Sequence, residues 1–178
     1  MAKAKTKPAP LAIEQVPIDS VHLDPANVRK HPERNLAAIK ASLARFGQQK
    51  PIVIDGDGIV RAGNGTLEAA RALGWSTIAA VRTTLTGSEA TAYAIADNRT
   101  AELAEWDETG LAEQLRALQS EEIDLSDVGY TDDELDGLID RLAGEMVPNF
   151  EPASIDEQGK LDEKAPVKCP ECGHKFTT

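Results

Sequence analysis

The sequence is poor in cysteine, in aromatic residues and in long apolar runs, and each shortage excludes a class of protein. Its two cysteines, Cys169 and Cys172, are too close together to hold a fold by disulfides. No apolar run is long enough to span a bilayer, and no hydrophobic segment follows the basic first residues, as a secretory signal requires. The two cysteines instead look like half of a metal site, which fits a reducing cytoplasm. With 178 residues and 4% aromatics, we expect one main core of Leu, Ile, Val and Ala.

The chain also lacks a generally basic surface, since its net charge is −11. Residues 8–82 carry nine basic and seven acidic groups, whereas residues 83–145 carry three basic and seventeen acidic groups. An anionic partner is therefore expected near residues 25–75, with Arg29 as the first candidate contact. Residues 83–145 are expected to repel nucleic acid and to attract a basic protein partner.

Hydrophobic periodicity and turn residues predict the order of elements. Pro32 and Gly47 bound a helix with an apolar stripe, and two Asp-Gly pairs at 55–58 predict a hairpin. A second helix follows the turn at 63–66, and a strand covers 78–81. From Thr86 the chain is mainly helical, with capping patterns at Thr86–Glu89 and Thr131–Glu134 and an apolar stripe that continues through Trp106. Trp75 and Trp106 are expected in the core. We expect a disordered leader (1–13), a mixed domain (14–110), an acidic helical extension (111–143), a linker (144–166) and a tail (167–178).

The turn Gly63-Asn64-Gly65-Thr66 lies between a predicted strand and a predicted helix. Backbone N–H groups at such a helix start are unpaired and can bind a phosphate. The glycines would let a ligand approach, the Asn64 amide could donate to it, and Thr66 could cap the helix or contact the ligand. An ordinary capped turn is an equally good interpretation of this segment alone. The dinucleotide and Walker patterns both fail here.

The tail segment Cys169-Pro170-Glu171-Cys172-Gly173-His174 has the spacing of a zinc knuckle. Zinc takes four ligands, so the two cysteines and His174 predict only part of a Zn²⁺ site. A partner chain, His22, His31 or water would complete it, and completion by a second subunit would make a homodimer.

Four short motifs then follow one another: Pro25-x-Asn27-x-Arg29, Gly47-Gln48-Gln49-Lys50-Pro51, Gly63-Asn64-Gly65-Thr66 and Asp97-Asn98-Arg99. In order and spacing they resemble the N-terminal domain of the ParB/sulfiredoxin-like family over about residues 14–110. The chain is similar in particular to the "ParB-like nuclease domain" proteins of phages and mobile elements. The resemblance implies a small domain of the α/β (mixed α+β) class, here with a helical C-terminal extension.

The resemblance also implies a ligand, because partition proteins of the family bind cytidine triphosphate (CTP) with Mg²⁺. By position, Asn27 and Arg29 would contact a phosphate, and Gln48, Gln49 and Pro51 would line the base. Gly63, Asn64, Gly65 and Thr66 would hold the triphosphate, with Arg99 as a further phosphate contact. Asp97 and Asn98 would approach the metal ion and the γ-phosphate as the candidate catalytic pair.

The chain departs from the family at the turn. Nucleotide-binding members usually carry a Gly-Glu-Arg-Arg-like box there and another Arg two residues later, whereas this chain has Asn64, Gly65, Thr66 and Glu68. Each charge-assisted contact is worth about 1.5–3 kcal/mol, so losing two predicts nucleotide binding weaker by about a hundredfold or more. Sulfiredoxin activity needs a cysteine in this turn, and the turn has none. The acidic second half lacks the charge of a site-specific DNA reader.

These observations predict an accessory protein of phage or mobile-element DNA metabolism that binds a nucleotide or a nucleic-acid phosphate. One alternative is a metal-dependent DNA nuclease, with Asp97 as its first carboxylate and Asp24, Glu68 or Asp107 as candidate partners. Another is a protein-interaction adaptor with a vestigial pocket. Enzymatic activity stays open between DNA cleavage and weak triphosphate hydrolysis.

Overall fold

The computed structural model describes residues 11–146 and 167–176. Contacts along the chain divide it into two units, Met1–Leu142 and Ala143–Thr178, and each is described by itself. The predicted leader (1–13) and linker (144–166) fall largely outside the described residues, and the other predicted domain boundaries stay predictions.

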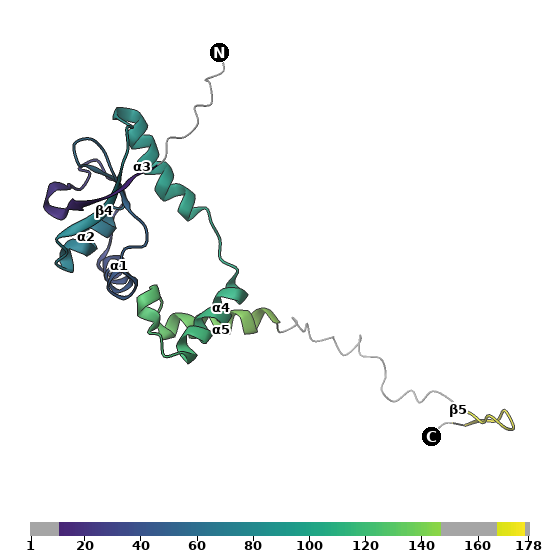
Figure 1. The fold of residues 1–178 in the computed structure, drawn as a ribbon. Helices are drawn as coiled ribbons and strands as arrows, with labels where there is room; N and C mark the ends of the chain where they lie inside the picture. The colour runs from purple at the N-terminus through teal and green to yellow at the C-terminus, as the bar shows by residue number, and fades with distance from the viewer. Residues whose placement is uncertain (1–10, 147–166, 177–178) are drawn as a thin grey trace, which may run out of the picture. The chain divides into compact units, whose positions relative to one another are not determined.

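A four-stranded mixed sheet forms the centre of the first unit (Figure 1). Its strands are β1 (Ile13–Pro17), β2 (Ile52–Ile54), β3 (Val60–Ala62) and β4 (Thr77–Arg82), in the order β1-β4-β2-β3. Strand β4 pairs antiparallel with β1 and parallel with β2, and β2 pairs antiparallel with β3. The predicted hairpin at 55–58 is thereby confirmed, and a mixed α+β class is observed.

Helices α1 (Glu33–Phe46) and α2 (Asn64–Ala72) lie against each other (Figure 1). Helix α1 begins after Pro32 and ends at Gly47, whose φ of 69° suits a residue without a side chain. Leu43 of α1 and Leu67 of α2 join Ile52, Ile54 and Ile78 of the sheet in one buried core. This core fixes the start of α2 beside the sheet, where the predicted site lies.

The rest of the first unit is helical, as the sequence predicted. Its elements are α3 (Gly87–Glu102), α4 (Glu108–Ser120), η2 (Leu125–Val128) and α5 (Asp132–Met146). Leu115, Leu125 and Leu135 form a second, smaller apolar cluster. Hydrogen bonds between Thr131 and Glu134 in both directions make a capping box at the start of α5. Thr86 precedes α3 but makes no side-chain capping bond.

The prediction that Trp106 belongs to the core is wrong, because its surface is 71% exposed. Leu103, in the same segment between α3 and α4, is 62% exposed. Helix α3 ends at Glu102 and α4 begins at Glu108. The side chains between them therefore do not continue the apolar face of either helix. Trp75, in contrast, packs against the main core.

The described part of the second unit consists of the last residues of α5 (143–146) and a hairpin of β5 (Val167–Lys168) and β6 (Lys175–Phe176). Among the residues that the structure describes, no helix combines the length with the apolar character needed to cross a membrane.

Candidate functional site

A cavity of about 210 Å³ opens at the start of α2. Five segments surround it: the turn after the short helix η1 (Ile18–Ser20), one residue of α1, the start of β2, the junction of β3 with α2, and one face of α3. Most of the site residues predicted from the sequence line it, namely Asn27, Arg29, Pro51, Gly63, Asn64, Gly65, Thr66, Asp97 and Asn98. The fold thus brings together residues up to 71 positions apart in the sequence, as Asn27 and Asn98 are.

The floor of the cavity is the first turn of α2. Gly63 precedes the helix with φ 96°, and the first helical hydrogen bond runs from the Leu67 N–H to the Gly63 carbonyl at 3.0 Å. The N–H groups of Asn64, Gly65 and Thr66 therefore come before the helical ladder begins and have no partner within it. Together with the helix dipole they favour an anion at this end of the cavity.

Glycine at position 63 is required by its conformation and its packing. Gly63 has φ 96°, and a Cβ there would lie 2.7 Å from Cγ2 of Ile52. A Cβ on Gly65 would lie 2.8 Å from Cε1 of His31, so a larger residue there requires the His31 side chain to move. Close approach of a ligand is therefore not needed to explain why glycine stands at position 63.

Asn64 is buried, and its side chain is already engaged within the protein. Its Oδ1 accepts the Asp24 N–H at 3.0 Å, and its Nδ2 donates to the Val60 carbonyl at 3.3 Å. The side chain thus ties the turn at residue 24 to the start of α2, which differs from the expectation that it donates to a ligand. Thr66 lies inside α2, and the residue at the cap position is Gly63, so Thr66 does not cap the helix.

Asn27 fixes the backbone of Arg29. Its Oδ1 accepts the Arg29 N–H and its Nδ2 donates to the Arg29 carbonyl, each at 3.0 Å. The Arg29 guanidinium forms an ion pair with Glu102 near the end of α3, with both side chains about two-fifths exposed. A pair this exposed is worth little in water, so an anion in the cavity can replace Glu102 as the partner of Arg29.

The cavity is also lined by Lys50, which belongs to the second motif, and by residues that belong to none, among them His31, Ile39, Arg61 and Tyr93. Lys50 is exposed and makes no ion pair within the described residues. His31 Nδ1 lies 2.7 Å from Oδ1 of Asn35. No motif marks Ile39, Arg61 or Tyr93 as cavity residues, because they reach the cavity only through the packing of α1, β3 and α3 around it.

Arg61 differs from the other cations because it is neutralised by two buried carboxylates. Its guanidinium lies 2.8 Å from Oδ2 of Asp24 and 2.7 Å from Oδ2 of Asp55. Burial alone would raise the pKa of Asp55, but the Ile59 N–H, the Arg61 guanidinium and the Asp57 N–H outweigh it and lower that pKa below 3.8. Arg61 therefore links Asp24 to Asp55 at the side of the cavity and adds little net charge to it.

The opposite wall is α3, which contributes Tyr93, Asp97 and Asn98. Burial and the nearby Asp97 charge raise the pKa of Tyr93 above 10. The Asn98 amide donates to the Ala94 carbonyl at 2.8 Å, so its oxygen is the group left for a ligand. Among the lining residues within the described part of the chain, Asp97 is the one carboxylate. Asp24 pairs with Arg61, and Asp107 caps α4 by accepting the Gly110 N–H.

Three of the predicted site residues do not line the cavity: Gln48, Gln49 and Arg99. The Gln48 carboxamide bonds both backbone groups of Ala79 on β4, at 2.8 and 2.9 Å. The Gln49 side chain donates to the Phe46 carbonyl, and Arg99 lies 3.4 Å from Glu102. The structure therefore gives these side chains contacts within the protein instead of places around a ligand.

The predicted metal ligands of the tail lie in the β5–β6 hairpin. The neighbouring N–H groups of Cys172 and Glu171 and the Cys172 side chain hold the pKa of the Cys169 thiol below its ordinary value. The described residues contain no cluster of three or more His, Cys, Asp or Glu side chains that could hold a metal ion. His174 therefore does not join the two cysteines in such a cluster.

No protein-family model and no curated protein matches the chain. Among solved structures, it is similar to the C-terminally truncated chromosome-partitioning protein ParB from Caulobacter crescentus complexed with CTP-γ-S. That match has a TM-score of 0.63 and 18% identity, and covers 74% of this chain and 79% of the other.

Two further matches have lower scores. A Pnob8-like ParB-N domain matches with a TM-score of 0.43 at 16% identity, over 94% of this chain and 57% of the other. The Caulobacter crescentus ParB complexed to the centromeric parS site matches with a TM-score of 0.42 at 19% identity, over 71% and 64%.

The match with a TM-score of 0.63 covers most of both chains, and the described architecture is a mixed sheet with helices that place the four motifs around one cavity. The chain therefore has a ParB-like fold.

Proposed function

We propose that this chain binds the phosphate groups of a nucleotide in the cavity at the start of α2. The proposal rests on one observation. The N–H groups of the first α2 turn, which have no partner in the helix, and two cations, Arg29 and Lys50, line the same cavity. A ParB of the same fold was solved with CTP-γ-S, which supports a nucleoside triphosphate as the ligand class.

Binding is expected to be weak for this ligand class. The turn has no arginine, Arg61 is neutralised by Asp24 and Asp55, and Arg29 must exchange Glu102 for the ligand. Lys50, Arg29 and the helix start are then the main attractions for a phosphate chain. The resemblance of the four motifs to ParB-like proteins of phages and mobile elements is what supports a role as an accessory factor of DNA metabolism.

Mg²⁺ fits the same cavity by the chemistry of its donors. Asp97 offers a carboxylate and Asn98 an amide oxygen, and Mg²⁺ is commonly bound by one or two carboxylates together with substrate phosphates. Asp97 with Asn98 would hold the ion, and the ion would supply charge neutralisation for the phosphates. A nuclease would need a second carboxylate, which the described lining residues do not provide, so we propose binding and not cleavage.

The test is thermal unfolding and calorimetric titration with CTP, GTP, ATP and UTP, each with and without Mg²⁺. A ligand that binds only the folded state raises its unfolding midpoint. We expect a Mg²⁺-dependent rise with at least one nucleotide, and an Arg29→Ala variant weaker by about 10- to 100-fold.

Arg99→Ala is the matched control, because Arg29 and Arg99 both contact Glu102 but only Arg29 lines the cavity. We expect the control to bind like the wild type. The absence of a shift with every nucleotide at millimolar concentration, or equal loss in the two variants, would refute the proposal.

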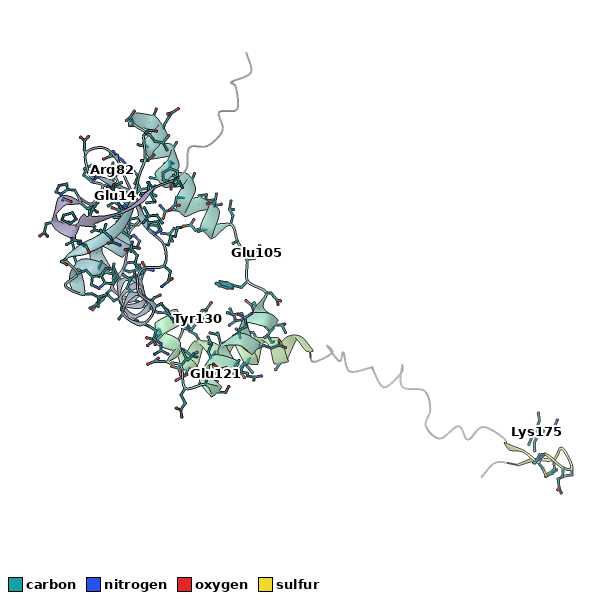
Figure 2. The ribbon with its side chains drawn as sticks, in the orientation of Figure 1. Glu14, Arg82, Glu105, Glu121, Tyr130 and Lys175 are labelled. Atoms are coloured by element: carbon teal, nitrogen blue, oxygen red, sulfur yellow. The ribbon has the colours of Figure 1, made fainter. Side chains whose placement is uncertain are left out.

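A second function, docking of a basic protein partner, is favoured by the segment between α3 and α4. Exposed Leu103 and Trp106 stand there beside Glu105 and Asp107, with Glu105 on the connection between the helices (Figure 2). Aromatic anchors surrounded by charge are typical of interaction surfaces. A partner from the native host should be retained by the wild type and by the control Glu121→Ala, and lost by Trp106→Ala. Equal retention by all three would exclude this surface.

A further inference from the structure

The β5–β6 hairpin contains both cysteines of the chain in its turn. The Cys169 N–H donates to the His174 carbonyl at 2.9 Å, and the Gly173 N–H donates to the Cys169 carbonyl at 3.0 Å. Gly173 has φ 76°, which a residue with a side chain adopts only at a cost. These bonds fold the turn tightly around Cys169.

The same turn brings the two cysteines together. Because the Gly173 N–H closes the turn onto the Cys169 carbonyl, Cys169 and Cys172 lie within one turn of the chain. Two cysteines at this spacing on a tight turn are a common pair of ligands for one zinc ion.

The geometry supplies two ligands of a site that needs four. Structural Zn²⁺ is almost always four-coordinate and tetrahedral, with Cys₄ as a common set. His174 does not join a cluster of three ligands with the cysteines in the described residues, and its carbonyl is engaged with Cys169. The 178 residues contain no other cysteine.

We propose that Cys169 and Cys172 bind a Zn²⁺ ion together with the same two cysteines of a second copy of this chain, so that the metal joins two chains. A tetrahedron has two-fold axes, so two identical hairpins related by such an axis can provide four equivalent sulfurs. Two-fold symmetric pairs are also the commonest arrangement of identical chains. This inference concerns the second unit and does not depend on phosphate binding in the first.

The experiment uses the full chain, purified under reducing conditions and freed of metal, and titrated with Co²⁺ as a coloured substitute for Zn²⁺. The visible absorption of tetrahedral thiolate-bound Co²⁺ reports occupancy, and light scattering after size-exclusion chromatography reports molar mass with Zn²⁺ and with a chelator. We expect saturation at one ion per two chains, a doubled mass with Zn²⁺, and return to the single-chain mass when the metal is removed.

Three variants make the result specific. Cys172→Ser should lose both the absorption and the doubled mass, whereas His174→Ala and the matched hairpin control Lys168→Ala should keep both. The unfolding midpoint of the first unit serves as the folding check, and we expect it to be unchanged in all three.

Four outcomes would overturn the inference. These are the absence of thiolate-bound Co²⁺, one ion per chain at the single-chain mass, loss of binding in His174→Ala, and a doubled mass that persists in Cys172→Ser. Each would show that the cysteines do not form a metal site shared between two copies.

Discussion

Arg61→Met is expected to destabilise the first unit strongly, because it removes the cation from a buried group of three charges. The Arg61 side chain is 19% exposed, and those of Asp24 and Asp55 are 7% and 9% exposed. Arg61 donates to Asp55 through Nε and Nη2 and to Asp24 through Nη1, at 2.7–2.9 Å. Met fills a similar volume, so the main change is the loss of charge and of these three bonds.

The magnitude follows from what is left behind. Removing one partner of a buried ion pair typically costs about 3–5 kcal/mol, because the other charge stays buried without compensation. Two carboxylates are left here, but Asp55 keeps the N–H groups of Asp57 and Ile59 on its Oδ1. We therefore expect a loss of about 3–5 kcal/mol in the free energy of unfolding at pH 7.

The loss should depend on pH. The folded-state pKa of Asp55 lies below the ordinary value of 3.8. The Asp55 carboxylate therefore stabilises the folded state fully above its ordinary pKa, and this stabilisation is lost as the pH falls through the folded-state pKa. As Asp55 becomes protonated, Arg61 has less charge to pair with. The difference between wild type and Arg61→Met should therefore shrink as the pH falls toward the folded-state pKa of Asp55, which lies below its ordinary value.

The assay is urea unfolding followed by circular dichroism at pH 7 and at acidic pH, with Arg82→Met as the control. Arg82 on β4 pairs with Glu14 on β1 at 2.6 Å, and the two lie side by side (Figure 2). Their side chains are 50% and 41% exposed, so this pair is worth only about 0–1 kcal/mol. Equal effects of the two substitutions, or a loss below about 1 kcal/mol for Arg61→Met, would refute the reasoning from burial.

Two further pairs of substitutions compare like changes in different surroundings by the same unfolding assay. Gly63→Ala should cost about 2–5 kcal/mol, because the residue has φ 96° and its Cβ would lie 2.7 Å from Ile52, whereas Gly137→Ala should gain about 0.5–1 kcal/mol in open space on α5. The same sign for both glycines would contradict this expectation. Thr131→Ala should cost about 0.5–2 kcal/mol by breaking the capping box of α5, and Thr86→Ala should have almost no effect, since Thr86 makes no side-chain capping bond. A larger loss for Thr86→Ala than for Thr131→Ala would show that the caps are wrongly placed.

The elements that sequence predicted well are those with local signals. Pro32 and Gly47 bound α1, the Asp-Gly pairs make the β2–β3 hairpin, and Thr131 with Glu134 starts α5. Each depends on backbone preferences or hydrogen bonds within a few residues, which the sequence displays directly. Thr86 shows the limit, since the same capping pattern marks the helix start but forms no side-chain bond.

What sequence could not predict depends on contacts between distant segments. The role of Arg61 requires Asp24, which is 37 positions away, and the engagement of Asn64 requires the backbone at the same turn. Tyr93 and His31 line the cavity without belonging to any motif. Trp106 was expected in the core because an apolar stripe was continued across a gap between two helices.

Gln48 makes another contact between segments that are distant in the sequence. Its carboxamide accepts the Ala79 N–H and donates to the Ala79 carbonyl, which is the pair of bonds that a peptide group of an adjacent strand would make. A side chain thus continues the hydrogen-bond ladder of β4 just before β2 begins at Ile52. Glutamate at this position would keep the acceptor but lose the donor. Two chains that share this segment therefore complete the sheet in the same way. They have this part of the architecture in common whether or not they bind the same ligand.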